Sequence, residues 1–319
     1  MRLLLCAGLL LSTVLMALAQ NIAPDPSADS DHDGLSDSLE NALLIQFAPR
    51  FIISSNDCST RPAQFVQNQI KPVVEEENGA IYGQVFPRAG HADQAEVHYY
   101  HLWRTDCGER GHNLDAEHVS ALLVRDNASN WSALYWYAAA HEDTVCDASQ
   151  ITRATTIDAR LHGPRVWISR GKHASFLSDV LCAHGCGGDS CRKMVPLATA
   201  KLINLGELSA PMSGATWVDS PEWPLATKMS RSDFAETRTA RVDLLPATNI
   251  AWANPDKRPL QAVIHGGNSA LSGAAVGQRD TNAALVLANT DTGSALDRAS
   301  GVTGRSLSKT VRRVKKALR

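Results

Sequence analysis

The chain has 319 residues, of which 44% are hydrophobic and 20% charged, and its formal net charge is -2 at pH 7. This length suits one sizeable domain or one domain with appendages, and beyond the N-terminus no uncharged stretch is long enough to cross a bilayer. Residues 305–319 carry seven of the 31 basic residues and no acid, so that, with Arg2 also set aside, 23 basic residues face 33 acidic ones. An acidic body of this kind argues against nucleic acid as the main partner.

Residues 1–19 are typical of a secretory signal peptide. One early charge, Arg2, precedes an apolar run over residues 3–17, and small residues end the run before Gln20. The run is too short for a membrane span, and no stop-transfer charges follow it. We therefore expect the protein to be exported, to the periplasm or the extracellular space.

Residues 29–40 (DSDHDGLSDSLE) fit the twelve-residue calcium-loop pattern, with glycine at the sixth place for a sharp bend. A helix should follow, because apolar residues recur at helical spacing from Leu39 to Phe47. The proline-rich entering side is a poor helix, so the loop resembles the calcium repeats of dockerins and thrombospondins, and a disordered acidic linker is the alternative. We assign residues 20–48 to this unit and predict that it binds Ca²⁺ through Asp29, Asp31, Asp33, the carbonyl of Leu35, Asp37 and Glu40.

Five later segments, at 79–86, 97–103, 117–124, 131–137 and 165–169, are rich in β-branched and aromatic residues and are separated by polar turns. Elements of this kind favour two packed sheets. We predict a mainly β protein whose residues 49–260 form a β-sandwich with a few peripheral helices.

The segment from Gly111 to His118 leads into the third of these strands. Since side chains alternate across a strand, Asp115 and Glu117 should share one face, about 6–7 Å apart, and Glu117 should point inward with the apolar residues that follow it. Two carboxylates at that spacing can bind one cation, whereas pairing of Glu117 with an arginine would be a purely structural arrangement.

Histidines also gather at the ends of these strands. Each one alone is best explained as a hydrogen-bonded structural residue, although several at neighbouring strand ends favour a shared site. The six residues are His98, His101, His112, His118, His141 and His173.

Six cysteines remain after the signal segment, and an even number in an oxidising compartment predicts three disulfides whose pairing the spacing leaves open. A zinc site formed by the last three cysteines and His184 is the alternative. The six are Cys58, Cys107, Cys146 and the three of the glycine-rich loop 182–191, namely Cys182, Cys186 and Cys191.

Residues 111–119 (GHNLDAEHV), the strand end at His141 and residues 169–176 (SRGKHASF) resemble, in order, motifs of the vacuolar protein sorting-associated protein 62 family. The first segment is also similar to the Gly-His-Arg-His-Asp-Trp-Glu heptad of necrosis- and ethylene-inducing peptide-like (NLP) toxins, which are secreted β-sandwiches with a divalent cation at the heptad. The resemblance implies cation ligands at His112, Asp115 and Glu117, with Asp106 as a further acid. Ala116 and Leu114 depart from the toxin heptad, which argues against toxin activity.

The last third carries weaker signals. Residues 192–205 suggest a helix or a strand under the sandwich, and Trp217, Trp223 and Trp252 suit core edges better than sugar binding. From residue 261 onward, small and polar residues predict a low-complexity, mobile tail. Its end, residues 305–319, has the pattern of a basic amphipathic helix, which could lie on an anionic membrane, dock on the acidic body or stay frayed in water.

These signals together predict a secreted protein that binds divalent cations at two places. One is Ca²⁺ in the loop at 29–40, and the other is Ca²⁺, Mg²⁺ or Mn²⁺ in the sandwich. Binding to a lipid or glycan surface through the second cation is the activity we expect. A metal-dependent hydrolase, with His141 or His173 handling the proton, is the alternative.

Overall fold

A computed structural model describes residues 28–66, 69, 71–108, 111–142, 144–183, 185–186, 188–206 and 232–255. The predicted signal peptide, Trp217, Trp223 and the tail from residue 261 lie outside these residues. Within them, no helix combines the length and apolar character needed to cross a membrane.

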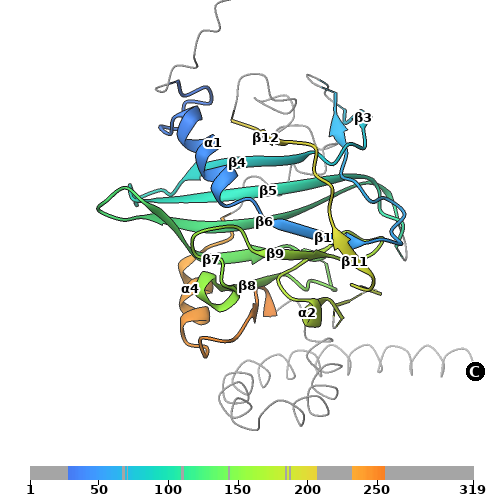
Figure 1. Ribbon diagram of the computed structural model, residues 1–319. Coiled ribbons are helices and arrows are strands. Elements are labelled where there is room, and N and C mark those ends of the chain that lie inside the picture. Colours follow the sequence, from blue (N-terminus) through green and yellow to red (C-terminus); the bar gives the residue numbers. More distant parts are fainter. Residues whose placement is uncertain are drawn as a thin grey trace, which may run out of the picture.

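The larger of two main sheets has seven strands in the order β12-β4-β5-β6-β7-β8-β13 (Figure 1). All neighbours pair antiparallel except β12 and β4, which are parallel. In chain order the strands are β4 (Ile81–Pro87), β5 (Gln94–Thr105), β6 (Asn113–Arg125), β7 (Trp131–Ala138), β8 (Gln150–Arg153), β12 (Leu202–Asn204) and β13 (Ala251–Trp252).

The smaller sheet has the order β10-β9-β1-β11, and it combines distant parts of the chain. Its strands are β1 (Arg50–Ser54), β9 (Arg165–Ile168), β10 (Ser175–Phe176) and β11 (Met194–Pro196). β1 pairs parallel with β9 and antiparallel with β11. The two sheets confirm the predicted mainly β sandwich, and the segment 192–205 supplies one edge strand to each of them.

Apolar side chains of both sheets form the main core. Phe51 and Ile53 of β1 pack in one cluster with Val119 and Ala121 of β6 and Trp136 of β7. Helix α1 (Asp37–Gln46) adds Leu43 and Leu44 to this cluster, and Figure 1 shows it beside β4. The predicted helix is confirmed, and it is part of the main core.

The outer face of the larger sheet is also covered. At one end, a hairpin of β2 (Gln64–Phe65) and β3 (Val74–Glu76) contributes Phe65 to a cluster with Tyr82 and Tyr100. At the other end, α4 (Glu236–Asp243) and Phe234 cover Tyr137. The middle of β5 and β6 is therefore buried on both faces, which explains why these strands carry long buried runs. The remaining helices are short: η1 (Ala154–Ile157) and α2 (Asp179–Ala183).

All six cysteines form disulfides: Cys58 with Cys107, Cys146 with Cys186, and Cys182 with Cys191. The predicted three bridges are thus confirmed and their pairing is defined. The zinc alternative at the glycine-rich loop is wrong, because none of its three sulfur atoms is left as a thiolate. Three bridges also suit a protein that folds in an oxidising, extracellular environment.

Candidate functional site

The calcium loop, residues 29–40, brings three carboxylates together. Ligand oxygens of Asp29, Asp31 and Asp33 lie within 4.8 Å of one another. Asp29 also shapes the loop, since its two oxygens accept the backbone N–H groups of Asp33 (3.2 Å) and Gly34 (3.0 Å). Gly34 has φ +94°, the left-handed conformation that the tight bend requires.

Glu40 completes the loop from the first turn of α1. Ser36 begins the helix as its N-cap, with its hydroxyl accepting the Leu39 N–H at 3.3 Å. The Glu40 side chain is fully buried, and its Oε1 has no hydrogen-bond partner among the described residues. Its Oε2 accepts a hydrogen bond of 3.4 Å from the Asn204 amide. Burying a carboxylate with so few donors is costly unless a cation compensates it.

Burial and neighbouring negative charges raise the pKa values of three carboxyl groups in this loop. Burial and the neighbouring carboxylates of Asp31 and Asp33 raise the pKa of Glu40 to about 8. Burial, with the charges of Asp33 and Asp29, raises the pKa of Asp31 to about 6. The pKa of Asp33 is also raised, chiefly by burial, and its buried Oδ2 has no hydrogen-bond partner among the described residues. These groups fit a hard cation held by oxygens.

Asp37 makes hydrogen bonds within the loop. Both of its oxygens accept hydrogen bonds from Ser30, at 2.8 Å from the backbone N–H and 2.7 Å from the hydroxyl. Its carboxylate therefore fastens the start of the loop to the start of α1, and a water-mediated contact to a cation stays a prediction. Leu35 lies between these acids, as the pattern requires for its carbonyl.

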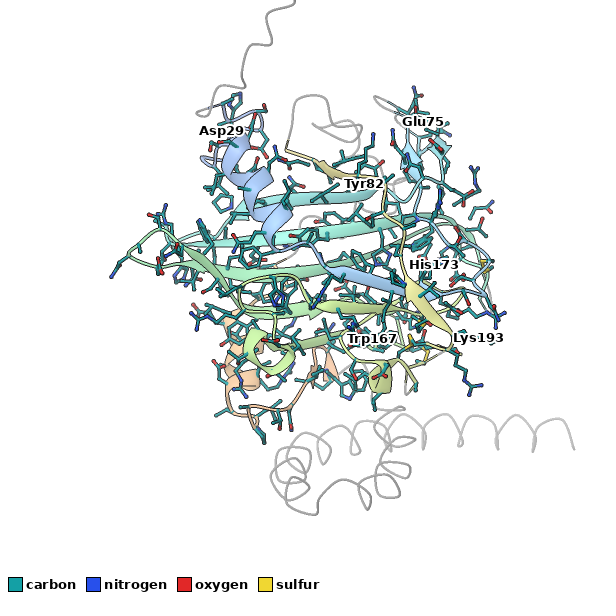
Figure 2. The ribbon with its side chains drawn as sticks, viewed as in Figure 1. Asp29, Glu75, Tyr82, Trp167, His173 and Lys193 are labelled. Carbon is teal, nitrogen blue, oxygen red and sulfur yellow. A yellow bond between two sulfur atoms is a disulfide. The ribbon has the colours of Figure 1, made fainter. Side chains whose placement is uncertain are left out.

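A second polar site lies where β6 begins, in a cleft of about 240 Å³. It is lined by Asp106, His112, Leu114, Asp115, Ala116, Glu117, His141, Glu142, Thr144 and Lys172. Asp115 and Glu117 pair across the ladder with Trp103 and His101 of β5, and both are buried, at 8% and 5% exposed. They share the inward face, as the strand alternation predicts. Figure 2 shows that His173, beside this cleft, lies well apart from Asp29 in the calcium loop.

The predicted ligands of the second cation line this cleft without converging. His112 Nε2 lies 3.8 Å from Asp106 Oδ2, and the imidazole is 58% exposed. Among the described residues, the groups that place three ligand atoms within 4.8 Å of one another do not include these four. The second cation site stays a prediction.

Asp115 contacts a histidine from a distant turn. Its Oδ2 lies 3.2 Å from Nδ1 of His173, and Nε2 of the same imidazole lies 3.5 Å from Asp57 Oδ1. The ring stacks on Trp103, with centroids 3.9 Å apart. Burial acts to lower the pKa of His173, but the hydrogen bonds and charges of Asp115 and Asp57 raise it to about 9. His173 is therefore a buried imidazolium held between two carboxylates.

His141 lies at the rim of the cleft and is paired to the cysteine-rich loop. Its Nε2 is 2.8 Å from Asp189 Oδ2. Burial acts to lower the pKa of His141, but Asp189, and then Glu117, raise it, while Lys172 opposes them. The His141 imidazole therefore lies beside the carboxylates of Asp189 and Glu117 and the ammonium group of Lys172.

Sequence reasoning missed a further cluster on the outer face of the sheet. His98, His118 and Asp233 offer ligand atoms within 4.8 Å of one another, and all three are buried. The two histidines lie on neighbouring strands, which the sequence could indicate, but Asp233 follows more than a hundred residues later and carries no local signal.

Comparison with known proteins gives a limited result. No family model and no curated protein matches the chain. Solved NLP structures are similar: a triple mutant of NLPPya (14% identity, TM-score 0.38, covering 67% of this chain and 84% of that chain) and NLPPya in complex with glucosamine (17%, 0.33, 57% and 75%). A third is necrosis and ethylene inducing protein 2 from the causal agent of cocoa's witches' broom disease (18%, 0.32, 51% and 73%).

Of the resemblances drawn from the sequence, only the one to NLP proteins reappears among these structures. The resemblances to the vacuolar-sorting family and to dockerins are not supported. With TM-scores below 0.5 and identities below 25%, the similarity assigns neither family nor function to this chain.

Proposed function

We propose that this is an exported calcium-binding β-sandwich protein in which Ca²⁺ joins the N-terminal loop to the body. The observation that supports this most directly is the Glu40 carboxylate, which is fully buried, lies among the charges of Asp31 and Asp33, and has an oxygen with no hydrogen-bond partner among the described residues. A divalent cation would remove the repulsion and supply the missing partner.

The proposed ligands are those of the sequence pattern: Asp29, Asp31, Asp33, the Leu35 carbonyl and both oxygens of Glu40. Asp37 would contact the ion through a water molecule. The site includes the body as well as the N-terminal loop, because the amide of Asn204, the last residue of β12, donates a hydrogen bond to the Glu40 carboxylate. Calcium would therefore hold α1 and the edge strand β12 together. Stabilisation by a ligand that binds only the folded state grows with its concentration.

Metal analysis of the purified mature protein tests the proposal. We expect one tightly held Ca²⁺ per chain, lost in Glu40→Gln and Asp33→Asn and retained in Asp93→Asn, whose carboxylate lies in an exposed turn. Chelation should lower the melting temperature of the wild type and of the control, but not that of Glu40→Gln. Equal calcium content in Glu40→Gln and the wild type would contradict the proposal.

We further propose that the cleft at the start of β6 binds a polar head group, either of a glycan or of a lipid at a membrane surface. The supporting observation is its mixed lining, since Glu117, His141 and Lys172 combine acceptors and donors suited to hydroxyl groups or phosphate. A divalent cation bound by Asp106, His112, Asp115 and Glu117 would extend this role.

Binding assays with glycan arrays and with anionic liposomes, each with and without added Ca²⁺, Mg²⁺ or Mn²⁺, test the cleft. Glu117→Gln and Lys172→Met should reduce binding at least tenfold, whereas Asp93→Asn should not. Asp115→Asn is a poorer test, because it also removes a partner of His173. Unchanged binding in Glu117→Gln and Lys172→Met would exclude the cleft.

The hydrolase alternative gains less support. His173 is fully buried and held as an imidazolium by Asp57 and Asp115, so near neutral pH it is a poor general base. His141 is directed to Asp189. Turnover that chelation abolishes, and that added metal restores, would revive this alternative.

A further inference from the structure

A buried cluster of metal-ligating side chains lies on the outer face of the larger sheet and shares no residue with the calcium loop or with the lining of the cleft. His98 of β5 and His118 of β6 project from this face, and Asp233 comes from the segment that leads into α4. Asp233 Oδ2 lies 3.0 Å from His118 Nε2 and 3.8 Å from His98 Nδ1. Bonds of about 2.0–2.1 Å to a tetrahedral ion would place ligand atoms about 3.4 Å apart, between these two values.

Polar atoms in this cluster lack the partners that burial demands. His98, His118 and Asp233 are at most 1% exposed. Within the described part of the chain, His98 Nδ1, His118 Nδ1 and the hydroxyl of Tyr100 have no hydrogen-bond partner. Tyr100 pairs across the ladder with His118, so the three unpartnered atoms belong to the same small region. Buried atoms of this kind usually bind water or an ion.

The surrounding residues resemble the outer shell of a metal site. His98 Nε2 lies 3.4 Å from Glu96 Oε2, which leaves Nδ1 of the same ring free to face Asp233. A carboxylate on the far nitrogen of a histidine ligand is the usual arrangement in zinc sites, where it fixes the tautomer. Glu96 is itself held by the Ser232 hydroxyl at 3.0 Å, and Ser120 donates a hydrogen bond to Asp233.

Charge also favours a cation. If both histidines are neutral, as metal binding requires, the cluster contains the two buried carboxylates of Asp233 and Glu96. One divalent ion balances them. Two imidazole nitrogens and one carboxylate oxygen suit zinc, whereas Ca²⁺ prefers a cage made of oxygens alone.

We propose that His98, His118 and Asp233 bind one Zn²⁺ ion, which fastens the segment at residues 232–235 to the seven-stranded sheet. A hydroxyl of Ser120 or Tyr100, or a water molecule, would complete the coordination. The burial of all three ligands makes the site structural, since a catalytic zinc keeps an open position for substrate. The proposal is independent of the calcium loop, which shares none of these residues.

The experiment uses the full mature protein with its disulfides formed. The protein is stripped with a chelator, supplied with excess Ca²⁺ to saturate the loop, and titrated with Zn²⁺ or Co²⁺. His98→Gln, His118→Gln and Asp233→Asn remove ligands, Glu96→Gln alters only the outer shell, and His91→Gln is the control in an exposed turn. Near-ultraviolet circular dichroism establishes that each variant is folded.

We expect one Zn²⁺ per chain in the wild type and in His91→Gln, and the visible absorption of tetrahedral Co²⁺ in both. The ligand variants should lose the metal, and Glu96→Gln should bind it about 10- to 100-fold more weakly. If the folded wild type takes up neither ion, the cluster is a plain ion pair between Asp233 and the histidines, and the proposal is overturned. Equal binding by wild type and Glu96→Gln would overturn the outer-shell assignment, even if the ligand variants fail to fold.

Discussion

Leu44 of helix α1 lies directly over Gly83 of strand β4, so that a Cβ atom built on Gly83 would come within 2.7 Å of Leu44 Cδ2. The helix approaches the sheet this closely because the glycine has no side chain. The Tyr99 hydroxyl holds the same turn by donating to the Leu44 carbonyl at 2.9 Å. This contact positions Glu40, one turn earlier in α1.

Replacing Gly83 by alanine should therefore move α1 and destabilise the fold by about 1–3 kcal/mol, as overpacking does elsewhere. Urea unfolding with saturating calcium measures the change. A double-mutant cycle with Leu44→Ala supplies the control, because the smaller side chain should absorb part of the clash and make the two losses less than additive. Strict additivity would mean that the two residues do not touch.

The His173 imidazolium predicts a pH-dependent stability. Since its pKa rises from 6.5 to about 9 on folding, the charged form stabilises the fold fully below about pH 6.5. This contribution, on the order of 3 kcal/mol, is lost as the pH rises through about 9. Urea unfolding at a series of pH values, with calcium saturating, should show the decline in the wild type.

His173→Asn should make the free energy of unfolding less dependent on pH, and should lower it at pH 6. Asparagine suits the left-handed backbone at this position, where φ is +53°. His91→Asn, in an exposed turn, should keep the wild-type profile. A His173→Asn profile that still falls between pH 6.5 and 9 by the full amount would assign the effect to other groups.

The three disulfides should contribute unequally to stability. The Cys58–Cys107 bridge closes a separation of 49 residues and the Cys182–Cys191 bridge one of 9. The chain-entropy model gives roughly 4 kcal/mol for the longer loop and roughly 2.5 kcal/mol for the shorter one. Paired Cys→Ser variants, compared by urea unfolding, check this order, and a larger loss from the shorter loop would contradict it.

Gly206 closes the calcium loop from the body side. A Cβ atom there would lie 3.0 Å from both Asp31 Oδ2 and Glu40 Oε2, so a side chain would displace two proposed ligand oxygens. Gly206→Ala should weaken calcium binding about tenfold, or about 1.4 kcal/mol, in isothermal titration. Thr199→Ala, exposed on the connection that precedes β12, should bind calcium as the wild type does, and equal affinity in both variants would place the ion elsewhere.

Local sequence patterns predicted much of the fold. The spacing of Leu39, Leu43 and Leu44 predicted α1, and β-branched and aromatic runs predicted β4, β5, β6, β7 and β9. They did not predict β1 or α4. For β1 the reason is that it is a short strand whose pairing partners begin at Arg165 and Met194. Contacts of that range carry no local periodicity.

The same difference between local patterns and long-range contacts applies to the residues of the candidate sites. The loop around Asp31 and Glu40 is contiguous in sequence, so its pattern is readable, although the contribution of Asn204 is not. Asp115 was predicted to face inward, but its partner His173 comes from a turn far along the chain, and the pairing of the cysteines depends on the same long-range folding.

The position of β1 between β9 and β11 governs the order in which the protein can be completed. An exported chain emerges with its N-terminus first, yet β1 finds both neighbours only after Pro196 has followed, and the calcium loop gains its cap only at Gly206. Until then at least one edge of β1 stays unpaired, although strands up to β7 already supply core partners for Phe51 and Ile53, so the nascent chain must be kept from pairing with other chains through that edge. A chain cut short just before Gly206 should be a substrate for proteases and chaperones, even though it contains every strand of the smaller sheet.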